Sequence, residues 1–186
     1  MHQEHQYILL NAAAYVAGVA ALVYEYFERG FYPTGSEILE NKFLPTSDLV
    51  RAVIIASAEL ITSANETQLE EDTGRLRGDR TPNSLSGHGV VNLASFVSFK
   101  SNMKVFNKIQ VGDYQHFLMK FKITADQLKS QEKHDLRIAF AYKDPSSTNN
   151  HPALKLNIDM YIILLNDTIV FGNHRPEENE ERFSTV

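Results

Sequence analysis

The fold of this chain is decided by residues 11–30, which read NAAAYVAGVAALVYEYFERG. The apolar run around them, Ile8 to Val23, covers about 16 residues, fewer than the roughly 20 of a membrane span. The preceding MHQEHQ lacks the cationic start of a secretory signal. Gly30 can take the left-handed conformation that ends a helix, and Pro33 follows closely. We therefore predict a core helix over 11–30, buried nearly all round, with a signal peptide as the alternative.

The composition is that of a globular protein, because 43% of the 186 residues are hydrophobic and 22% are charged. This length suits one domain, or a partial domain with a small companion. The net charge of −5 argues against a nucleic-acid partner, which would need clustered Lys and Arg. The chain has no cysteine, so disulfides, zinc–thiolate sites and cysteine nucleophiles are excluded.

A second helix is predicted to begin at Thr46 or Ser47, since either residue is a natural N-cap. Its spacing of apolar and small side chains gives one face for packing, made of Leu49, Val50, Val53, Ile54 and Ser57. Residues 63–84 are charged and polar, which predicts a long exposed loop.

The period of the pattern changes from helical to two after Met103. Apolar and polar residues alternate in 114–123, in 135–144 and in 154–162, and Asn166-Asp167 supplies a turn before the next apolar run. Half-buried strands of this kind indicate an antiparallel β-sandwich or jelly roll. The predicted fold class is α+β, with helical residues 1–98 followed by a β-sandwich domain at 99–186.

Several stretches, taken in chain order, resemble the C-terminal portion of the subtilisin-like serine peptidases. Val16-Ala17-Gly18 and the following VAALVYEYF are similar to the second half of the helix that carries the family's catalytic serine. The other similar stretches are ERGFYPTG, PTSDLVRAVIIASA, PNSLSGHGVVNL, LRIAFAYKDP, PALKLNIDM, and FGN followed by ENEE. The resemblance covers residues 11–181 and implies the end of a subtilisin-like α/β domain with an accessory β-sandwich. From the resemblance we also expect a secreted or endomembrane location.

The resemblance places the catalytic serine six residues before Val16, where this chain has Leu10. The family's usual glycine, threonine and proline around that serine are Ile8, Leu9 and Ala14 here. The family's aspartate, histidine and oxyanion asparagine all precede the serine helix, so no catalytic residue is assigned.

The resemblance therefore predicts a C-terminal fragment or degenerate form of a serine endopeptidase, inactive as given. A polypeptide substrate is expected only with an upstream part. The alternatives are a non-enzymatic binding module on the same fold, and a secreted β-sandwich with an N-terminal signal.

The serines and histidines that could be considered for a catalytic or metal site are better interpreted as ordinary turn and surface residues. Ser86 and His88 lie two residues apart on a glycine turn, which is poor geometry for a rigid nucleophile–base pair. The remaining histidines have no metal-ligand spacing: His2, His5, His116, His134, His151 and His174. Phe27, Phe31 and Tyr32 are expected to pack the helix end.

Four oxygen-bearing side chains in the β region suit calcium, namely Asp144, Asn157, Asp159 and Asn173. We favour their interpretation as ordinary turn and surface residues, so no cofactor is predicted, and calcium stays the alternative.

The helices of a subtilisin-like domain normally cover a parallel sheet that is buried on both faces. This chain keeps few of those strands, so the faces of 11–30 and 47–59 should be partly uncovered. We expect poor solubility or self-association through these apolar helices, and no stable membrane span.

Overall fold

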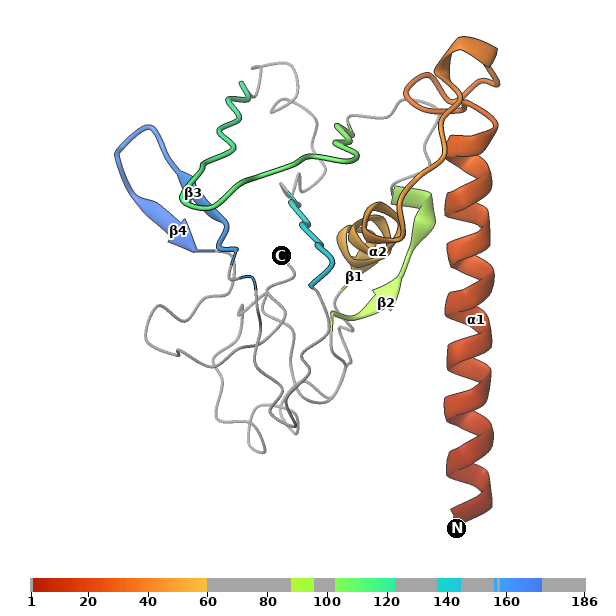
Figure 1. The fold of residues 1–186 in the computed structure, drawn as a ribbon. Coiled ribbons are helices and arrows are strands. Elements are labelled where there is room, and N and C mark those ends of the chain that lie inside the picture. Colours follow the sequence, from red (N-terminus) through yellow and green to blue (C-terminus); the bar gives the residue numbers. More distant parts are fainter. Residues whose placement is uncertain are drawn as a thin grey trace, which may run out of the picture.

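The computed structural model describes residues 2–59, 88–95, 103–122, 137–144, 156 and 158–171, with the side chains of 2–10, 170 and 171 left aside. Figure 1 shows a long helix beside a shorter one. One strand pair lies close to the shorter helix, and a second strand pair lies to the left of the helices, with extended segments between. The described residues therefore form a mixed α+β structure. Its elements are α1 (His2–Glu28), η1 (Leu39–Asn41), α2 (Ser47–Ala56), β1 (Ala58–Glu59), β2 (Val90–Val91), η2 (Leu93–Ser95), β3 (Tyr161–Ile163) and β4 (Ile169–Phe171).

The helix α1 ends as the sequence predicts. The amide of Gly30 donates to the carbonyl of Phe27 at 3.0 Å, and the amide of Phe31 donates to the carbonyl of Tyr26 at 3.0 Å. With Gly30 at φ +77°, these two bonds form a Schellman motif, which satisfies the last carbonyls of the helix. The rings of Tyr26 and Phe31 stack at 5.9 Å and supply the apolar contact that accompanies this motif. The start differs from the prediction, because the helix already begins at His2.

Gly30→Ala should destabilise the protein by about 1–2 kcal/mol or more, because the residue has a positive φ and a Cβ would overlap the carbonyl oxygen of Ile38. Gly18→Ala is the matched control. Gly18 lies inside α1 with no atom near the added Cβ, so alanine should stabilise the protein by roughly 0.5–1 kcal/mol. Urea unfolding of both variants measures these free energies. Equal effects of the same sign would contradict the assignment of Gly30 as the helix cap.

The second helix, α2, begins at Ser47 with Thr46 as its N-cap, as predicted. The Oγ1 of Thr46 accepts a hydrogen bond from the amide of Leu49 at 3.2 Å. Asp48 stands in the first turn, where a negative charge favours the positive end of the helix dipole. The predicted packing face is confirmed, since Leu49, Val53 and Ser57 are buried.

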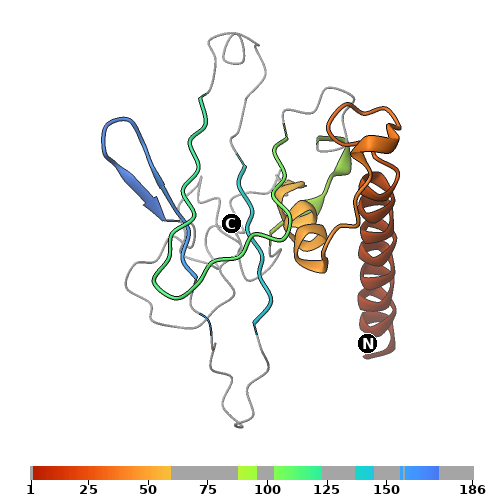
Figure 2. The same ribbon diagram turned by 45° about the horizontal axis from the view of Figure 1, so that its top comes forward.

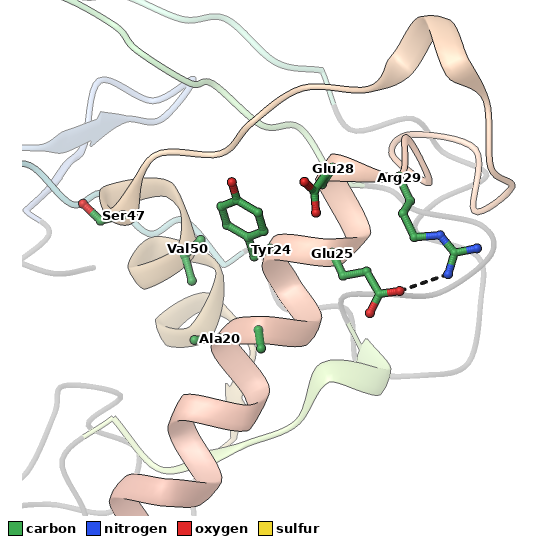
Figure 3. Close-up of a pocket in the computed structure, with 8 residues that line it drawn as sticks. Ala20, Tyr24, Glu25, Glu28, Arg29, Ser47 and Val50 are labelled. Atoms are coloured by element: carbon green, nitrogen blue, oxygen red, sulfur yellow. Dashed lines mark hydrogen bonds and ion pairs between the residues drawn. The ribbon is translucent and has the colours of Figure 1, made fainter.

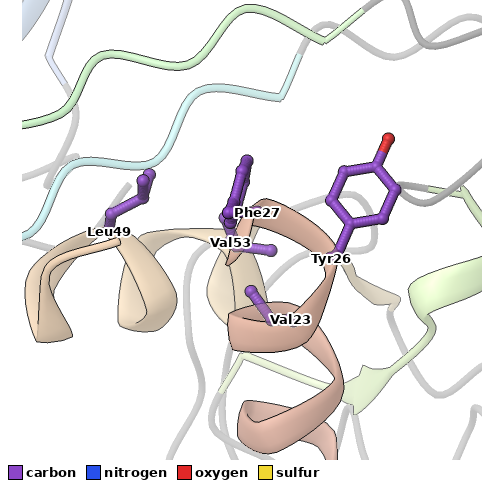
Figure 4. Close-up of a cluster of buried hydrophobic side chains, with 5 residues drawn as sticks. All are labelled: Val23, Tyr26, Phe27, Leu49 and Val53. Atoms are coloured by element: carbon purple, nitrogen blue, oxygen red, sulfur yellow. The ribbon is translucent and has the colours of Figure 1, made fainter. Parts of the chain in front are cut away.

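The core lies where the last turns of α1 cross α2 (Figure 4). Among the described residues, its buried members are Val23, Tyr26 and Phe27 from α1 and Leu49 and Val53 from α2. The predicted packing of aromatic rings at the helix end is confirmed. The rings of Phe27 and Tyr32 lie 5.8 Å apart, beside the Tyr26–Phe31 stack.

The predicted burial of α1 nearly all round is wrong. Residues 11–18 are exposed, and the side chain of Tyr15 is 61% exposed. Both views show the N-terminal half of α1 extending beyond the other described elements (Figures 1 and 2). The reason is geometric, because α2 is only 10 residues long and crosses α1 near its C-terminal end. The sequence-based expectation of a partly uncovered apolar face on this helix is confirmed.

Residues 103–107 pack against the helices although they follow the predicted domain boundary at 98/99. The hydroxyl of Tyr32 accepts a hydrogen bond from the amide of Val105 at 3.2 Å and lies 3.5 Å from the carbonyl of Met103. The side chains of Met103 and Val105 also pack on the core. Residues 103–107 are thus part of the same packed unit as the two helices.

Asn107 completes this attachment. Its Oδ1 accepts from the amide and from the Oγ1 of Thr46, at 3.3 and 3.0 Å, and its Nδ2 donates to the carbonyl of Leu44 at 3.3 Å. The residue that caps α2 is therefore held by a side chain 61 positions away in the sequence.

Asn107→Ala should lower the free energy of unfolding by about 1–2 kcal/mol, because it leaves partly buried polar groups around Thr46 without their partner. Lys104→Ala, at an exposed neighbouring position, should change it by less than about 0.5 kcal/mol. Chemical denaturation of both variants tests this. An Asn107→Ala protein as stable as the wild type would mean that residues 103–107 are not held to the helices.

Two strand pairs are formed within the described residues, both antiparallel. In the first, β1 pairs with β2, so that Ala58 faces Val91. In the second, β3 pairs with β4 through a tight turn. The predicted turn at Asn166-Asp167 is confirmed. The amide of Asp167 donates to the carbonyl of Leu164 at 3.0 Å, and Asp167 has φ +59°, the left-handed conformation that a three-residue hairpin loop requires.

The predicted strands at 114–123 and 135–144 are not formed in their described parts, 114–122 and 137–144. Phe117 and Phe121, which the alternation placed on a buried face, are 52% and 42% exposed. Alternation stabilises a strand only when a partner strand covers its apolar face. Here Phe117 meets the ring of Phe106 at 5.8 Å, but no paired strand among the described residues covers it. The predicted loop at 63–84 lies outside the described residues.

Candidate functional site

A groove of about 750 Å³ lies between α1 and α2 (Figure 3). It is open to solvent, and its lining is mostly apolar. The residues that line it are Ala20, Ala21, Tyr24, Glu25, Glu28, Arg29, Ser47 and Val50.

Arg29, the basic residue in the lining of this groove, is held by ion pairs. Arg29 donates to Glu25 at 3.0 Å and to Glu37 at 2.7 Å, and its guanidinium lies 5.0 Å from the ring centre of Phe31. The hydrogen bond from Arg29 is the main reason that the pKa of Glu37 lies below its ordinary value. Lys42 lies 3.5 Å from Glu37. Because Arg29 is already engaged by two carboxylates and a ring, it is poorly placed to capture an anionic ligand.

The uncharged polar groups of the groove do not form a catalytic arrangement. Figure 3 shows the hydroxyl of Ser47 directed away from Tyr24 and Glu28. The lining contains no histidine, so no serine there is paired with an imidazole base. The groove is therefore suited to binding an apolar side chain or helix rather than to acyl transfer.

The position expected for a catalytic serine, Leu10, lies inside α1. Helical backbone continues on both sides of it, from His2 to Glu28. In a helix interior each amide is bonded to the carbonyl four residues earlier, so no amide near Leu10 is free to act as an oxyanion donor. Neither the nucleophile nor the oxyanion site of the family is present at this point of the described backbone.

The Ser86–His88 pair can be placed only in part, because Ser86 lies outside the described residues. His88 comes just before β2 and is half-buried, and burial lowers its pKa. Gly89 has φ +107°, in agreement with the interpretation as a glycine turn. The buried serine nearby in the fold is Ser57, whose Oγ donates to the carbonyl of Ile54 at 2.8 Å and acts as a structural group.

The stability of the protein should fall as the pH is lowered through the ordinary histidine value of 6.5. The folded chain holds His88 neutral to a lower pH than the unfolded chain, so protons bind preferentially to the unfolded state. His88→Gln removes this titration and should reduce the loss of stability between about pH 7.5 and pH 5.5. Urea midpoints of both proteins at several pH values provide the measurement. An identical pH slope in the variant would contradict this role.

Two of the four calcium candidates lie in one neighbourhood. Tyr142 donates to the carbonyl of Leu156 at 2.9 Å, and Asp144 accepts from the amide of Leu156 at 3.0 Å. Burial raises the pKa of Tyr142, and the charges of Asp144 and Asp159 raise it further, so both carboxylates are near this ring. Asn157 and Asn173 lie outside the described residues. Within the described part of the chain, no group of three or more His, Asp or Glu side chains could hold a metal ion.

Among the described residues, the remaining histidines do not add a site. His116 is exposed, His2 and His5 lie in the first turns of α1, and His134, His151 and His174 are outside the described residues.

A second, apolar groove of about 430 Å³ lies on the other side of α1, and no pattern in the sequence indicates it. Tyr26 lines it, and the hydroxyl of Tyr26 is buried with no hydrogen-bond partner. Burial raises the pKa of this phenol, and Tyr32 adds to the effect. The other lining residues are Leu22, Glu25, Phe31, Leu93 and Ala94.

Comparison of the chain with models of protein families, with curated proteins and with solved structures found no match. In the part of the chain that the structure describes, neither helix is both long and apolar enough to cross a membrane.

Proposed function

We propose that this chain is the C-terminal portion, or a degenerate form, of a subtilisin-like serine peptidase that does not itself hydrolyse peptides. Its role in a complete protein is to supply the core behind the serine helix and to carry an accessory β-sandwich in residues 99–186. The support is the order of local features along the chain. The helix with Val16-Ala17-Gly18 is followed by the Gly30 turn and then by the helix capped at Thr46.

The proposed lack of peptidase activity rests on the residue at position 10. Leucine has no nucleophilic atom, and Leu10 stands within an unbroken helix rather than at an exposed helix start. A serine peptidase also needs a histidine base and an acid that orients it, and the groove beside α1 contains no histidine.

A second candidate function is a non-enzymatic binding module built on the same elements. The exposed apolar half of α1 favours it, because such a surface on a soluble chain normally marks an interaction site.

We expect no labelling of the purified chain by a fluorophosphonate probe and no cleavage of a fluorogenic peptide. Leu10→Ser should stay unreactive too, because a serine without a base and an oxyanion site has the reactivity of an ordinary hydroxyl. Labelling is read by in-gel fluorescence, with a known serine peptidase as the positive control. Labelling that disappears when a serine of this chain is replaced by alanine would overturn the proposal.

The coding sequence upstream of Met1 distinguishes the two candidates. An in-frame segment with aspartate, histidine and Gly-Thr-Ser motifs favours the peptidase portion. A stop codon directly upstream favours the binding module.

A further inference from the structure

The hairpin of β3 and β4 carries an asparagine with a hydroxyl residue two positions later. Residues 166–168 read Asn166-Asp167-Thr168, which is the tripeptide pattern of an acceptor for N-linked oligosaccharide. The chain contains one other tripeptide of this kind, Asn65-Glu66-Thr67, which lies outside the described residues. So short a pattern also occurs by chance, and the surroundings of Asn166 therefore decide whether it can serve as an acceptor.

The tip of this hairpin leaves room for a bulky sugar. All three residues of the tripeptide are exposed, and so are Leu165 before it and Ile169 after it. Both views show the loop between β3 and β4 directed away from α1 and α2 (Figures 1 and 2). An attached glycan needs a surface loop of this kind, because it is bulky and hydrated and does not pack inside a protein.

The turn also orders the side chain of the asparagine. Asp167 has φ +59°, and the backbone bends back so that the amide of Thr168 donates to the Oδ1 of Asn166 at 3.2 Å. This bond holds the oxygen of the carboxamide, while no partner among the described residues holds its Nδ2. A donor at the oxygen also stabilises the negative charge that develops there when the Nδ2 gives up a proton. The Nδ2 of Asn166 is therefore free to react.

From this geometry we infer that Asn166 is a site of N-linked glycosylation. The donor substrate is an oligosaccharide joined through pyrophosphate to a polyprenyl lipid. In the transfer, the Nδ2 of Asn166 forms a bond to C1 of the first sugar, the bond from C1 to the pyrophosphate oxygen breaks, and the Nδ2 releases one proton. The leaving group is the polyprenyl pyrophosphate. The inference does not rest on the proposed function, because the transfer depends on the tripeptide and its exposure.

The number of glycans on the full chain tests the inference. The chain is translated with endoplasmic-reticulum membranes, behind a cleavable secretory signal and a reporter acceptor tripeptide placed before Met1. Asn65→Gln is present throughout, so that Asn166 is the one acceptor tripeptide of the chain itself. Only molecules with the reporter glycan are counted, because these have entered the membranes. They should carry a second glycan, seen as a second mobility step that an N-glycosidase removes. This enzyme converts the modified asparagine to aspartate, which peptide mass spectrometry should locate at position 166.

Variants separate glycan attachment from the role of these residues in the turn. Asn166→Gln and Thr168→Ala should each leave the reporter glycan alone, whereas Thr168→Ser keeps the hydroxyl and should retain the second glycan. Asn11→Gln is the matched control, since Asn11 is exposed but has Ala13 two positions later, and its glycan number should stay unchanged.

A chain that carries the reporter glycan alone overturns the inference and leaves Asn166 as a turn residue only. A second glycan that persists in Asn166→Gln overturns it as well. The glycan number is independent of the probe-labelling result, so failure of one proposal leaves the other standing.

Discussion

The packing of the last turns of α1 on α2 is the interaction on which the described structure depends. Phe27 is fully buried and Val23 nearly so, and they meet Val53 and Leu49 across the crossing of the two helices. The other contacts of this region are arranged around that crossing. The Gly30 motif turns the chain back at the correct point, and the Thr46 cap starts α2 where its apolar face meets α1. Burial of these side chains supplies the main favourable free energy, while the surface ion pairs of Arg29 contribute little.

The position of this crossing also explains the double character of α1. Its C-terminal half provides core residues, while the exposed half keeps the same composition without a partner inside the described structure. Residues 11–18 of this helix are alanine-rich, uncharged and exposed. In the groove between α1 and α2, Arg29 is paired with Glu25, and no histidine lies beside the hydroxyls of the lining.

The features that could be predicted from the sequence are those that local physics determines. Gly30 ends a helix because of its own backbone freedom, and Thr46 starts one because its side chain reaches an amide three residues later. The turn at Asn166-Asp167 belongs to the same class. The features that failed depend on distant partners. Alternation at 114–122 cannot reveal whether another strand covers Phe117, and an apolar helix cannot reveal how much of its length α2 will reach. The buried hydroxyl of Tyr26 is likewise invisible in the sequence, because its lack of a partner is a property of the packed core.

The contacts of Tyr32 with residues 103–107 set the order in which this core can be completed during synthesis. Tyr32 is 71 residues from Met103 and 73 from Val105 along the chain. The helix pair of α1 and α2 is available as soon as residue 56 has left the ribosome, but the side of it that Met103 and Val105 cover stays open until about fifty more residues have been made. Closing a loop of that size has an entropic cost that grows only slowly with its length, so the delay affects the rate of folding more than the final stability. A nascent chain of this protein therefore passes through a state in which its aromatic cluster is assembled but not yet covered.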